Sequence, residues 1–260
     1  MGSTDAPSSS AAPKYLQIAD DLAAQIRAGE LAPGDAVPSE TELMERYAAA
    51  SGTVRKAVAE LRVMQLIETH HGKGSYVRRR PPVQRKSSDR FRRSHRLAGK
   101  AAYLAEVEQS GGEPSVIVLS VGAAPAPVEI AERLDVPAGT KVLARRRRYF
   151  LDGSPTEEAT SYLPWDVVKD IPEMFEDNPG GGGIYARLEE HGHTLADFTE
   201  TVRARLATKA ETVALALSPG APVIHLVRDA RTASGRVVEV CDTLMSADQF
   251  VLDYRFPAGD

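Results

Sequence analysis

The sequence predicts an α+β fold divided into two domains. Two helix patterns, a tight turn and a glycine-containing hairpin follow one another within residues 39–77, whereas residues 101–256 alternate strand patterns with short helices. A Pro- and Arg-rich stretch separates the two parts, and 260 residues suffice for two domains. We expect a disordered tail at 1–13, a helical domain with a hairpin at 14–78, a basic linker at 79–96 and a mostly antiparallel sheet domain at 97–257.

Composition and charge exclude several classes of protein. The chain carries 32 Lys and Arg against 36 Asp and Glu, a net charge of −4, so it is not basic overall. The tail at 1–13 is small and polar, cannot form a core and lacks the apolar stretch of a signal peptide. No run of about 18 apolar residues occurs, so we expect no membrane span. The single cysteine, Cys241, excludes an intramolecular disulfide and suits a reducing cytoplasm.

Three helices are predicted in the first domain. Apolar residues recur at helical spacing over 14–28, and Gly29 follows as a stop signal. A second helix begins after Ser39, an N-cap residue for which Glu42 completes a capping box. We expect Ser51 to cap the third helix, which carries an apolar face at helical spacing.

A hairpin follows the third helix. Apolar pairs at 66–67 and 76–77 flank the segment 70–74, whose two glycines indicate a tight tip. Helix, tight turn, helix and hairpin form the layout of a winged helix-turn-helix. In that layout the second helix of the motif enters the major groove of DNA.

The start of the third helix has the chemistry of a DNA contact. Thr53, Arg55 and Lys56 lie in its first turn, off the apolar face. Helix N-termini attract phosphate, and an arginine can donate two hydrogen bonds to a guanine. Residues 51–80 carry seven Lys and Arg against two acids, and residues 81–100 carry seven against one, so positive charge is local. The alternative is that Arg55 and Lys56 only form a solvated helix face.

This stretch resembles the DNA-binding domain of the GntR transcriptional regulators. The resemblance lies in PSE at 38–40, GTVRKAV at 52–58 and HGKG at 71–74. It implies that the start of the recognition helix contacts bases and phosphates, and that the tip of the wing reaches the minor groove. The family often has arginine where this chain has Thr41 and Ser51. The expected DNA-binding residues are Ser39, Glu40, Thr41, Ser51, Gly52, Thr53, Arg55, Lys56, His71, Gly72 and Lys73.

The segment after the wing is rich in arginine and contains two prolines at 81–82. Two interpretations remain open for it. It is a flexible tether, or some of its cations contact phosphate and add affinity that is independent of sequence and sensitive to salt. The later part, with Phe91, Arg92 and Arg93, could fold over a ligand of the second domain, as the corresponding segment does in related regulators.

Strand patterns dominate the second domain, and short helices interrupt them. Their order favours a mostly antiparallel sheet. Strands are predicted at 116–119, 142–151, 156–163, 198–204, 223–230 and 237–244, and helices at 128–134, 184–191 and 210–217.

This half resembles the UTRA effector domain of HutC-type GntR regulators, whose fold is similar to that of chorismate lyase. The residues that carry the resemblance are 134–139, 145–148, 152–155, 159–164, 184–188 and 235–240. The resemblance implies a domain that captures a small molecule. The similarity to chorismate lyase concerns the fold and implies no activity.

Four consecutive arginines, at 145–148, are the main candidates for ligand capture. Alternation along a strand sends two of them to each face, so one pair can point into a pocket. Guanidinium groups suit carboxylate or phosphate, although all four could instead be solvated or paired with acids. The family's two ligand arginines would fall on Arg147 and Tyr149, which favours a less charged or larger ligand. The expected effector-binding residues are Phe91, Arg92, Arg93, Arg145, Arg147, Tyr149, Thr160, Tyr162, Glu239 and Asp242.

Other candidate sites are weaker. The glycine run at 180–183 could bind an anion through free N–H groups or form a mobile loop, and no P-loop Lys-Ser/Thr follows it. Glu239 and Asp242 could accept hydrogen bonds from a ligand or lie on the surface of a hairpin. The three histidines at 191, 193 and 225 have no metal-ligand spacing near Cys241, so we expect no metal, no cofactor and no catalytic residues.

Together these features predict a ligand-responsive bacterial transcription regulator, most simply a repressor. The domain at 14–78 would bind double-stranded operator DNA, and the domain at 97–257 would form a homodimer and bind a small-molecule effector, which the arginines allow to be anionic. Two recognition helices would then fit a palindromic operator. The alternatives are an enzyme built on the second domain, which would turn over a substrate without DNA, and a constitutive DNA-binding protein, which would ignore metabolites.

Overall fold

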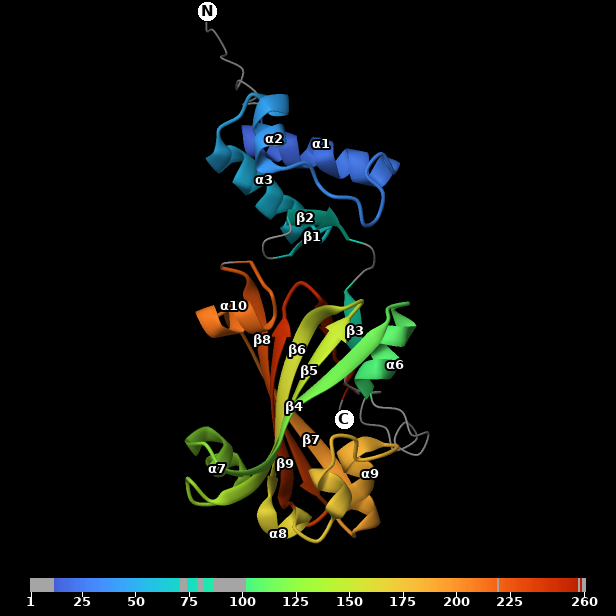
Figure 1. The fold of residues 1–260 in the computed structure, drawn as a ribbon, viewed down its shortest axis with the longest axis vertical. Helices are drawn as coiled ribbons and strands as arrows, with labels where there is room; N and C mark the ends of the chain where they lie inside the picture. The colour runs from blue at the N-terminus through green and yellow to red at the C-terminus, as the bar shows by residue number, and fades with distance from the viewer. Residues whose placement is uncertain are drawn as a thin grey trace, which may run out of the picture. The chain divides into compact units, whose positions relative to one another are not determined.

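The computed structural model describes residues 12–70, 74–78, 82–86, 102–218, 220–256 and 258. The chain divides into two compact units, Met1–Arg79 and Arg80–Asp260 (Figure 1). The predicted α+β fold class is confirmed, with helices and a small hairpin in the first unit and a large antiparallel sheet in the second. None of the helices in the described part of the chain is long and apolar enough to cross a membrane.

The first unit is a three-helix core with a two-stranded wing. Its elements are α1 (Lys14–Ala28), α2 (Glu40–Tyr47), α3 (Ser51–Val63), β1 (Ile67–His70) and β2 (Gly74–Val77). Fully buried apolar side chains from all three helices and both strands meet in one cluster, which includes Leu22, Leu43, Leu61 and Ile67. The helices cannot form this cluster singly, so packing holds them in the helix-turn-helix arrangement.

The caps of the helices are partly as predicted. Ser39 and Glu42 form the full capping box, with the Ser39 amide donating to Glu42 Oε2 over 2.7 Å. Ser51, however, does not cap α3. Ala50 is the N-cap residue and offers no side-chain bond, while its carbonyl accepts from the amides of Thr53 and Val54. The helix therefore begins one residue earlier than the cap signal suggested.

The second unit is built on one six-stranded sheet, in which every neighbouring pair of strands is antiparallel, as predicted. The strand order is β4-β5-β6-β9-β8-β7. The strands are β4 (Pro114–Pro125), β5 (Lys141–Leu151), β6 (Ser154–Pro164), β7 (Leu195–Leu206), β8 (Pro222–Thr232) and β9 (Val237–Ser246). β4 and β7 are consequently the two edges of the sheet.

Short helices cover both faces of the sheet. On one face, α8 (Trp165–Val168), η1 (Pro172–Phe175) and α9 (Gly183–Glu190) enclose an apolar cluster with Leu143 and Leu163. On the other face, α7 (Val128–Leu134) packs over β9 around Val240. Two further helices, α6 (Ala102–Gln109) and α10 (Lys209–Ala214), complete the unit.

One strand of a short parallel pair lies within the stretch expected to be a linker. β3 (Val83–Lys86) pairs with β10 (Phe250–Asp253). Val83 is fully buried with Phe250, and the side chain of Arg85 is 1% exposed and bonds Glu200 Oε1 over 2.7 Å. The arginine-rich composition of this stretch hid the strand, because Arg85 is an inward-facing residue whose carboxylate partner lies far along the chain.

Candidate DNA-binding surface and ligand cavities

The first turn of α3 presents its polar side chains to solvent. Val54, Ala57 and Leu61 are buried in the core, which leaves Arg55 and Lys56 exposed on the outer side. Gly52 is also exposed. This surface has the charge and the helix start that suit a nucleic-acid backbone and base edges.

The start of α2 supports this surface. Arg55 Nε donates to Glu40 Oε2 over 2.9 Å, so Glu40 orients the guanidinium of the recognition helix. Ser39 is occupied by the capping box, and its hydroxyl lies 2.8 Å from Glu42 Oε2. These hydrogen bonds lower the pKa of Glu42. Thr41 is exposed beside them.

The wing is tied to the recognition helix by a contact that the sequence did not indicate. Arg62, in the last turn of α3, donates to Thr69 Oγ1 over 2.8 Å, and Thr69 Oγ1 lies 2.8 Å from Ser75 Oγ across the hairpin. The two hydrogen bonds together hold both strands of the wing against α3. The predicted tip residues His71, Gly72 and Lys73 lie outside the described residues.

One face of the sheet in the second unit holds a cavity of about 600 Å³, here called the arginine cavity. The sheet contributes arginine, tyrosine and valine side chains, and the glycine run before α9 closes one side. The lining residues are Tyr103, Leu104, Val116, Val118, Arg145, Arg147, Tyr149, Asp177, Asn178, Pro179, Gly180, Gly181, Gly182, Gly183 and Ile184.

Arg145 mainly stabilises the backbone that forms one wall of this cavity. Its side chain is buried and donates to the carbonyls of Met174, Glu176 and Asp177, with 2.7 Å to the Glu176 oxygen. Burial, together with the neighbouring Arg147, lowers the pKa of Arg145 to about 10. A buried guanidinium bonded to three carbonyls fixes the loop between η1 and α9.

Arg147 is the better placed of the two arginines for a ligand. Its Nη2 donates to Ser161 Oγ over 2.7 Å, and its buried Nε has no partner in the described part of the protein. A guanidinium at a cavity wall can donate hydrogen bonds to a carboxylate or phosphate. Tyr149, the other residue expected at a ligand-arginine position, lies beside it with its ring 5.8 Å from the Arg147 guanidinium carbon.

A buried polar network lies behind Arg147. Ser161 Oγ donates to Glu239 Oε1 over 2.7 Å, and Tyr185 donates to Glu239 Oε2 over 2.5 Å. Arg228 Nη2 lies 3.4 Å from the same carboxylate, which is 0% exposed. Burial raises the pKa of Tyr185 well above its usual value. Glu239 therefore lies beneath the cavity and positions Arg147 through Ser161, rather than lining the cavity itself.

The other two arginines of β5 point to the opposite face, as alternation predicts. Arg146 and Arg148 both pair with Glu158, with Arg148 Nη2 2.8 Å from Glu158 Oε2. The acid between them, whose side chain is 13% exposed, neutralises part of their charge.

The glycine run is an ordered turn in the structure. Gly180, Gly182 and Gly183 have φ values of +89°, +77° and +66°, a region that other residues rarely adopt. The Gly183 amide donates to the Gly180 carbonyl over 3.1 Å. This internal bond occupies one of the amides that an anion would need.

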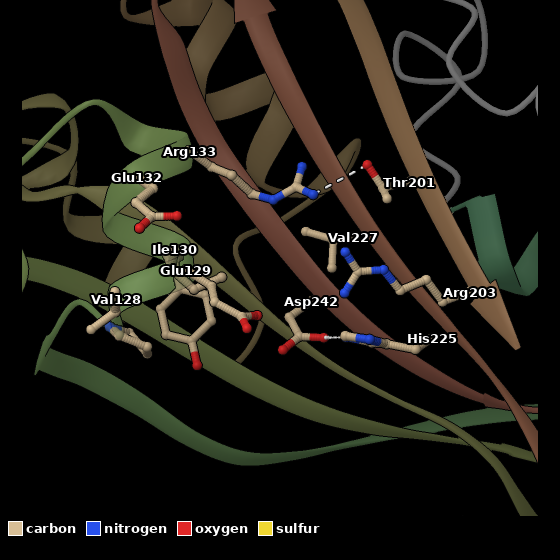
Figure 2. A pocket seen from close by; sticks show the side chains of 12 residues that line it. Val128, Glu129, Ile130, Glu132, Arg133, Thr201, Arg203, His225, Val227 and Asp242 are labelled. Carbon is tan, nitrogen blue, oxygen red and sulfur yellow. Dashed lines mark hydrogen bonds and ion pairs between the residues drawn. The ribbon is translucent and has the colours of Figure 1, made fainter. Parts of the chain in front are cut away.

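The opposite face of the sheet holds a second cavity of about 580 Å³, here called the α7 cavity (Figure 2). His225 Nε2 lies 2.7 Å from Asp242 Oδ1, and Arg133 bonds Asp229 over 3.0 Å and Thr201 over 3.1 Å. The lining residues are Pro127, Val128, Glu129, Ile130, Glu132, Arg133, Tyr162, Thr201, Arg203, His225, Val227 and Asp242.

The residues expected to bind an effector are thus divided between two faces. Arg145, Arg147 and Tyr149 line the arginine cavity, whereas Tyr162 and Asp242 line the α7 cavity. Thr160 and Glu239 line neither. The remaining three, Phe91, Arg92 and Arg93, lie outside the described residues.

A resident metal centre finds no support in the part of the chain that the structure describes, where no group of three or more His, Cys, Asp or Glu side chains could hold an ion. Cys241 is buried and free.

Comparison with known proteins gives one consistent picture. Residues 14–77 match the model of the bacterial regulatory proteins of the gntR family, and residues 109–251 match that of the UTRA domain. An HTH-type transcriptional regulator of Streptomyces coelicolor is 31% identical over 257 residues, covering 96% of this chain and 94% of that protein. The mannosyl-D-glycerate transport/metabolism system repressor MngR of Escherichia coli is 25% identical, over 94% of each chain.

A solved structure extends the likeness to three dimensions. The crystal structure of a GntR-family transcriptional regulator matches with a TM-score of 0.59 and 28% identity, covering 95% of this chain and 99% of that one. Both units of the present chain are included in that coverage. The chain therefore belongs to the GntR family of bacterial transcriptional regulators, in its HutC-type branch with a C-terminal UTRA domain.

Proposed function

We propose that this regulator is a homodimeric repressor that leaves its operator when a small molecule binds the arginine cavity. The observation that carries the proposal is the presence in one chain of an exposed cationic start of α3 and, in a separate unit, a cavity whose wall holds Arg147 with a free donor. The Escherichia coli relative is itself a repressor, which favours the same sense of control. The protein would act by binding alone, without catalysis.

The effector is expected to carry an acidic group. Arg147 offers guanidinium hydrogens at the wall of a cavity of about 600 Å³, a size that holds a small metabolite. Only one of the two family ligand positions is an arginine, since the other is Tyr149. A carboxylate with a neighbouring ring or hydroxyl group suits this pair better than a doubly charged phosphate.

Dimerisation is expected at the β4 edge of the sheet. Val116, Ile117 and Leu119 are 40%, 46% and 36% exposed on this strand. A long, apolar edge strand exposes unpaired N–H and C=O groups that a second strand can satisfy. Pairing two copies through β4 would give the two-fold symmetry that a palindromic operator requires.

Release from DNA would follow from a shift between domain arrangements. An effector releases the operator only if it binds the non-matching arrangement more tightly than the matching one. β3, which follows the wing in sequence, is held by the buried Arg85–Glu200 pair, and a shift of the sheet would be expected to move this strand with it.

Two measurements on the full-length chain test the proposal. Operator sequences are first selected from random duplexes by repeated binding and amplification, and metabolites are then screened for release of the selected operator. Arg147→Ala is expected to bind the operator normally and to lose release by at least about tenfold in effector concentration, because one charge-assisted contact is removed. Glu190→Gln, a change in an exposed pair, is the control.

The results separate the parts of the proposal. Normal release by Arg147→Ala would exclude the arginine cavity as the effector site. The failure of the full-length chain to select any sequence would exclude operator binding. Turnover of a metabolite in the absence of DNA would favour the enzyme alternative.

A further inference from the structure

We propose that the α7 cavity is a second ligand site, and that it binds a basic amino acid. The cavity lies on the face of the sheet opposite to the arginine cavity, between α7 and the strands β6, β9, β8 and β7 (Figure 2). The two cavities share no lining residue. A ligand here would thus be recognised independently of the effector.

The frame of the α7 cavity is fixed by internal ion pairs. Arg133 donates to both oxygens of Asp229, at 3.0 and 3.2 Å, and Asp229 is 5% exposed in its side chain. His225 Nε2 lies 2.7 Å from Asp242 Oδ1. These groups hold one another in place and define walls of the cavity, while Asp242 Oδ2 is not used by His225.

The unpaired charges define the ligand. Within the described residues, Arg203, Glu129 and Glu132 line the cavity without a hydrogen-bond or ion-pair partner. Figure 2 shows the two carboxylates on the α7 side and the Arg203 guanidinium entering from β7 on the other side. Arg203 on one side, and Glu129, Glu132 and the second oxygen of Asp242 on the other, complement a ligand with one carboxylate and two ammonium or guanidinium groups.

A basic amino acid has this set of charges at neutral pH. Its carboxylate would bind Arg203, and its α-ammonium would bind Asp242, whose Oδ2 is not used by His225. The distal amine would lie between Glu129 and Glu132 on α7. Ile130 and Val227 line the cavity as well and supply apolar surface for the methylene groups.

Three related probes test this assignment with isothermal titration calorimetry on the full-length chain in the absence of DNA. L-Lysine carries all three charges, L-norleucine lacks the distal amine, and cadaverine lacks the carboxylate. We expect L-lysine to bind at least about tenfold more tightly than either truncated probe, because each loses one charge-assisted contact.

Variants assign each charge to its partner. Arg203→Gln should reduce the affinity for L-lysine to that for cadaverine, and Glu129→Gln with Glu132→Gln should reduce it to that for L-norleucine. These side chains are exposed, so the variants should fold, which their melting temperatures check. Glu173→Gln, an exposed change elsewhere on the unit, is the matched control and should bind L-lysine normally.

Other outcomes overturn the proposal. Absence of L-lysine binding, equal binding of the three probes, or unchanged affinity in the cavity variants would each do so. Loss of self-association in Arg203→Gln without any lysine binding would instead identify the cavity as a contact with a second copy. Arg147→Ala should keep L-lysine binding, which separates this site from the effector site whatever the fate of the proposed repressor function.

Discussion

At the scale of single residues, Glu239 explains most about the face of the sheet that carries the arginine cavity. Its buried carboxylate accepts hydrogen bonds from Ser161 and Tyr185 and lies beside the guanidinium of Arg228. A buried carboxylate of this kind is stable only while its partners surround it. The orientation of Arg147 at the cavity depends on it, because Ser161 bonds both side chains.

Replacing Glu239 by Gln should therefore affect stability and ligand binding together. The change leaves the Arg228 guanidinium buried without its charge partner on β9, at a cost of about 3 kcal/mol in the free energy of unfolding. Chemical denaturation measures this loss. Glu190→Gln breaks an exposed Arg–Glu pair and should change the free energy by less than about 1 kcal/mol. Equal effects of the two changes would contradict the burial argument.

Arg55 is the corresponding residue of the DNA-binding unit. It is exposed at the start of α3, and Glu40 orients it. Arg55→Ala should weaken operator binding by about 1–3 kcal/mol and leave the proposed dimer intact, because the side chain is 69% exposed. Gel-shift titration and sedimentation measure the two properties.

A matched variant distinguishes a specific contact from general charge. Arg27→Ala removes an exposed arginine from the end of α1 in the same unit and should change operator affinity less. An unchanged gel shift for Arg55→Ala would refute the assigned role of Arg55.

At the scale of elements, the sequence predicted helices and strands where a local rule decides them. The capping box of α2 follows from two residues three positions apart, and the alternation of the arginines on β5 follows from strand geometry. The prediction that Ser51 caps α3 was wrong, because the backbone of Ala50 occupies the N-cap position and Ser51 is the first residue of the helix. No local rule indicates β3, because its partner strand β10 is more than 160 residues later in the sequence.

The candidate site was predictable to a similar extent. Its arginines could be found because they follow one another on one strand. The separation of Tyr162 and Asp242 from Arg147 could not, because it depends on the register between β5, β6 and β9, which places them on the opposite face.

The stability that the cap of α10 contributes should decrease at acidic pH. Hydrogen bonds from Arg205, and from Thr208 at the N-cap, lower the pKa of Glu211 from 4.5 to about 2. A carboxyl with a lowered pKa stabilises the fold fully above pH 4.5, and this stabilisation is lost as the pH falls toward 2. The difference in melting temperature between the unmodified chain and Glu211→Gln should thus be largest near neutral pH and shrink below pH 4.5. A difference independent of pH would contradict the assignment.

At the scale of the whole molecule, the two edges of the sheet offer a direct test of dimerisation. Ile117→Lys places a charge on the exposed β4 edge and should convert a dimer to a monomer, because lysine on an edge strand opposes pairing. Analytical ultracentrifugation measures the change, and operator affinity should fall with it.

The control lies on the other edge. Val202, on β7, is 43% exposed, and Val202→Lys should leave the dimer intact if β4 is the pairing edge. Dissociation by Val202→Lys and not by Ile117→Lys would reverse the assignment of the two edges.

The pairing of β3 with β10 has a consequence for how the chain is made. The ribosome completes the DNA-binding unit early, yet β3 finds its partner only after Phe250–Asp253 has been synthesised. During most of translation the nascent protein therefore holds a finished helix-turn-helix unit while β3, the first strand of the second unit, still lacks β10. Premature termination before β10 should yield fragments whose DNA-binding unit is intact but no longer answers to a metabolite.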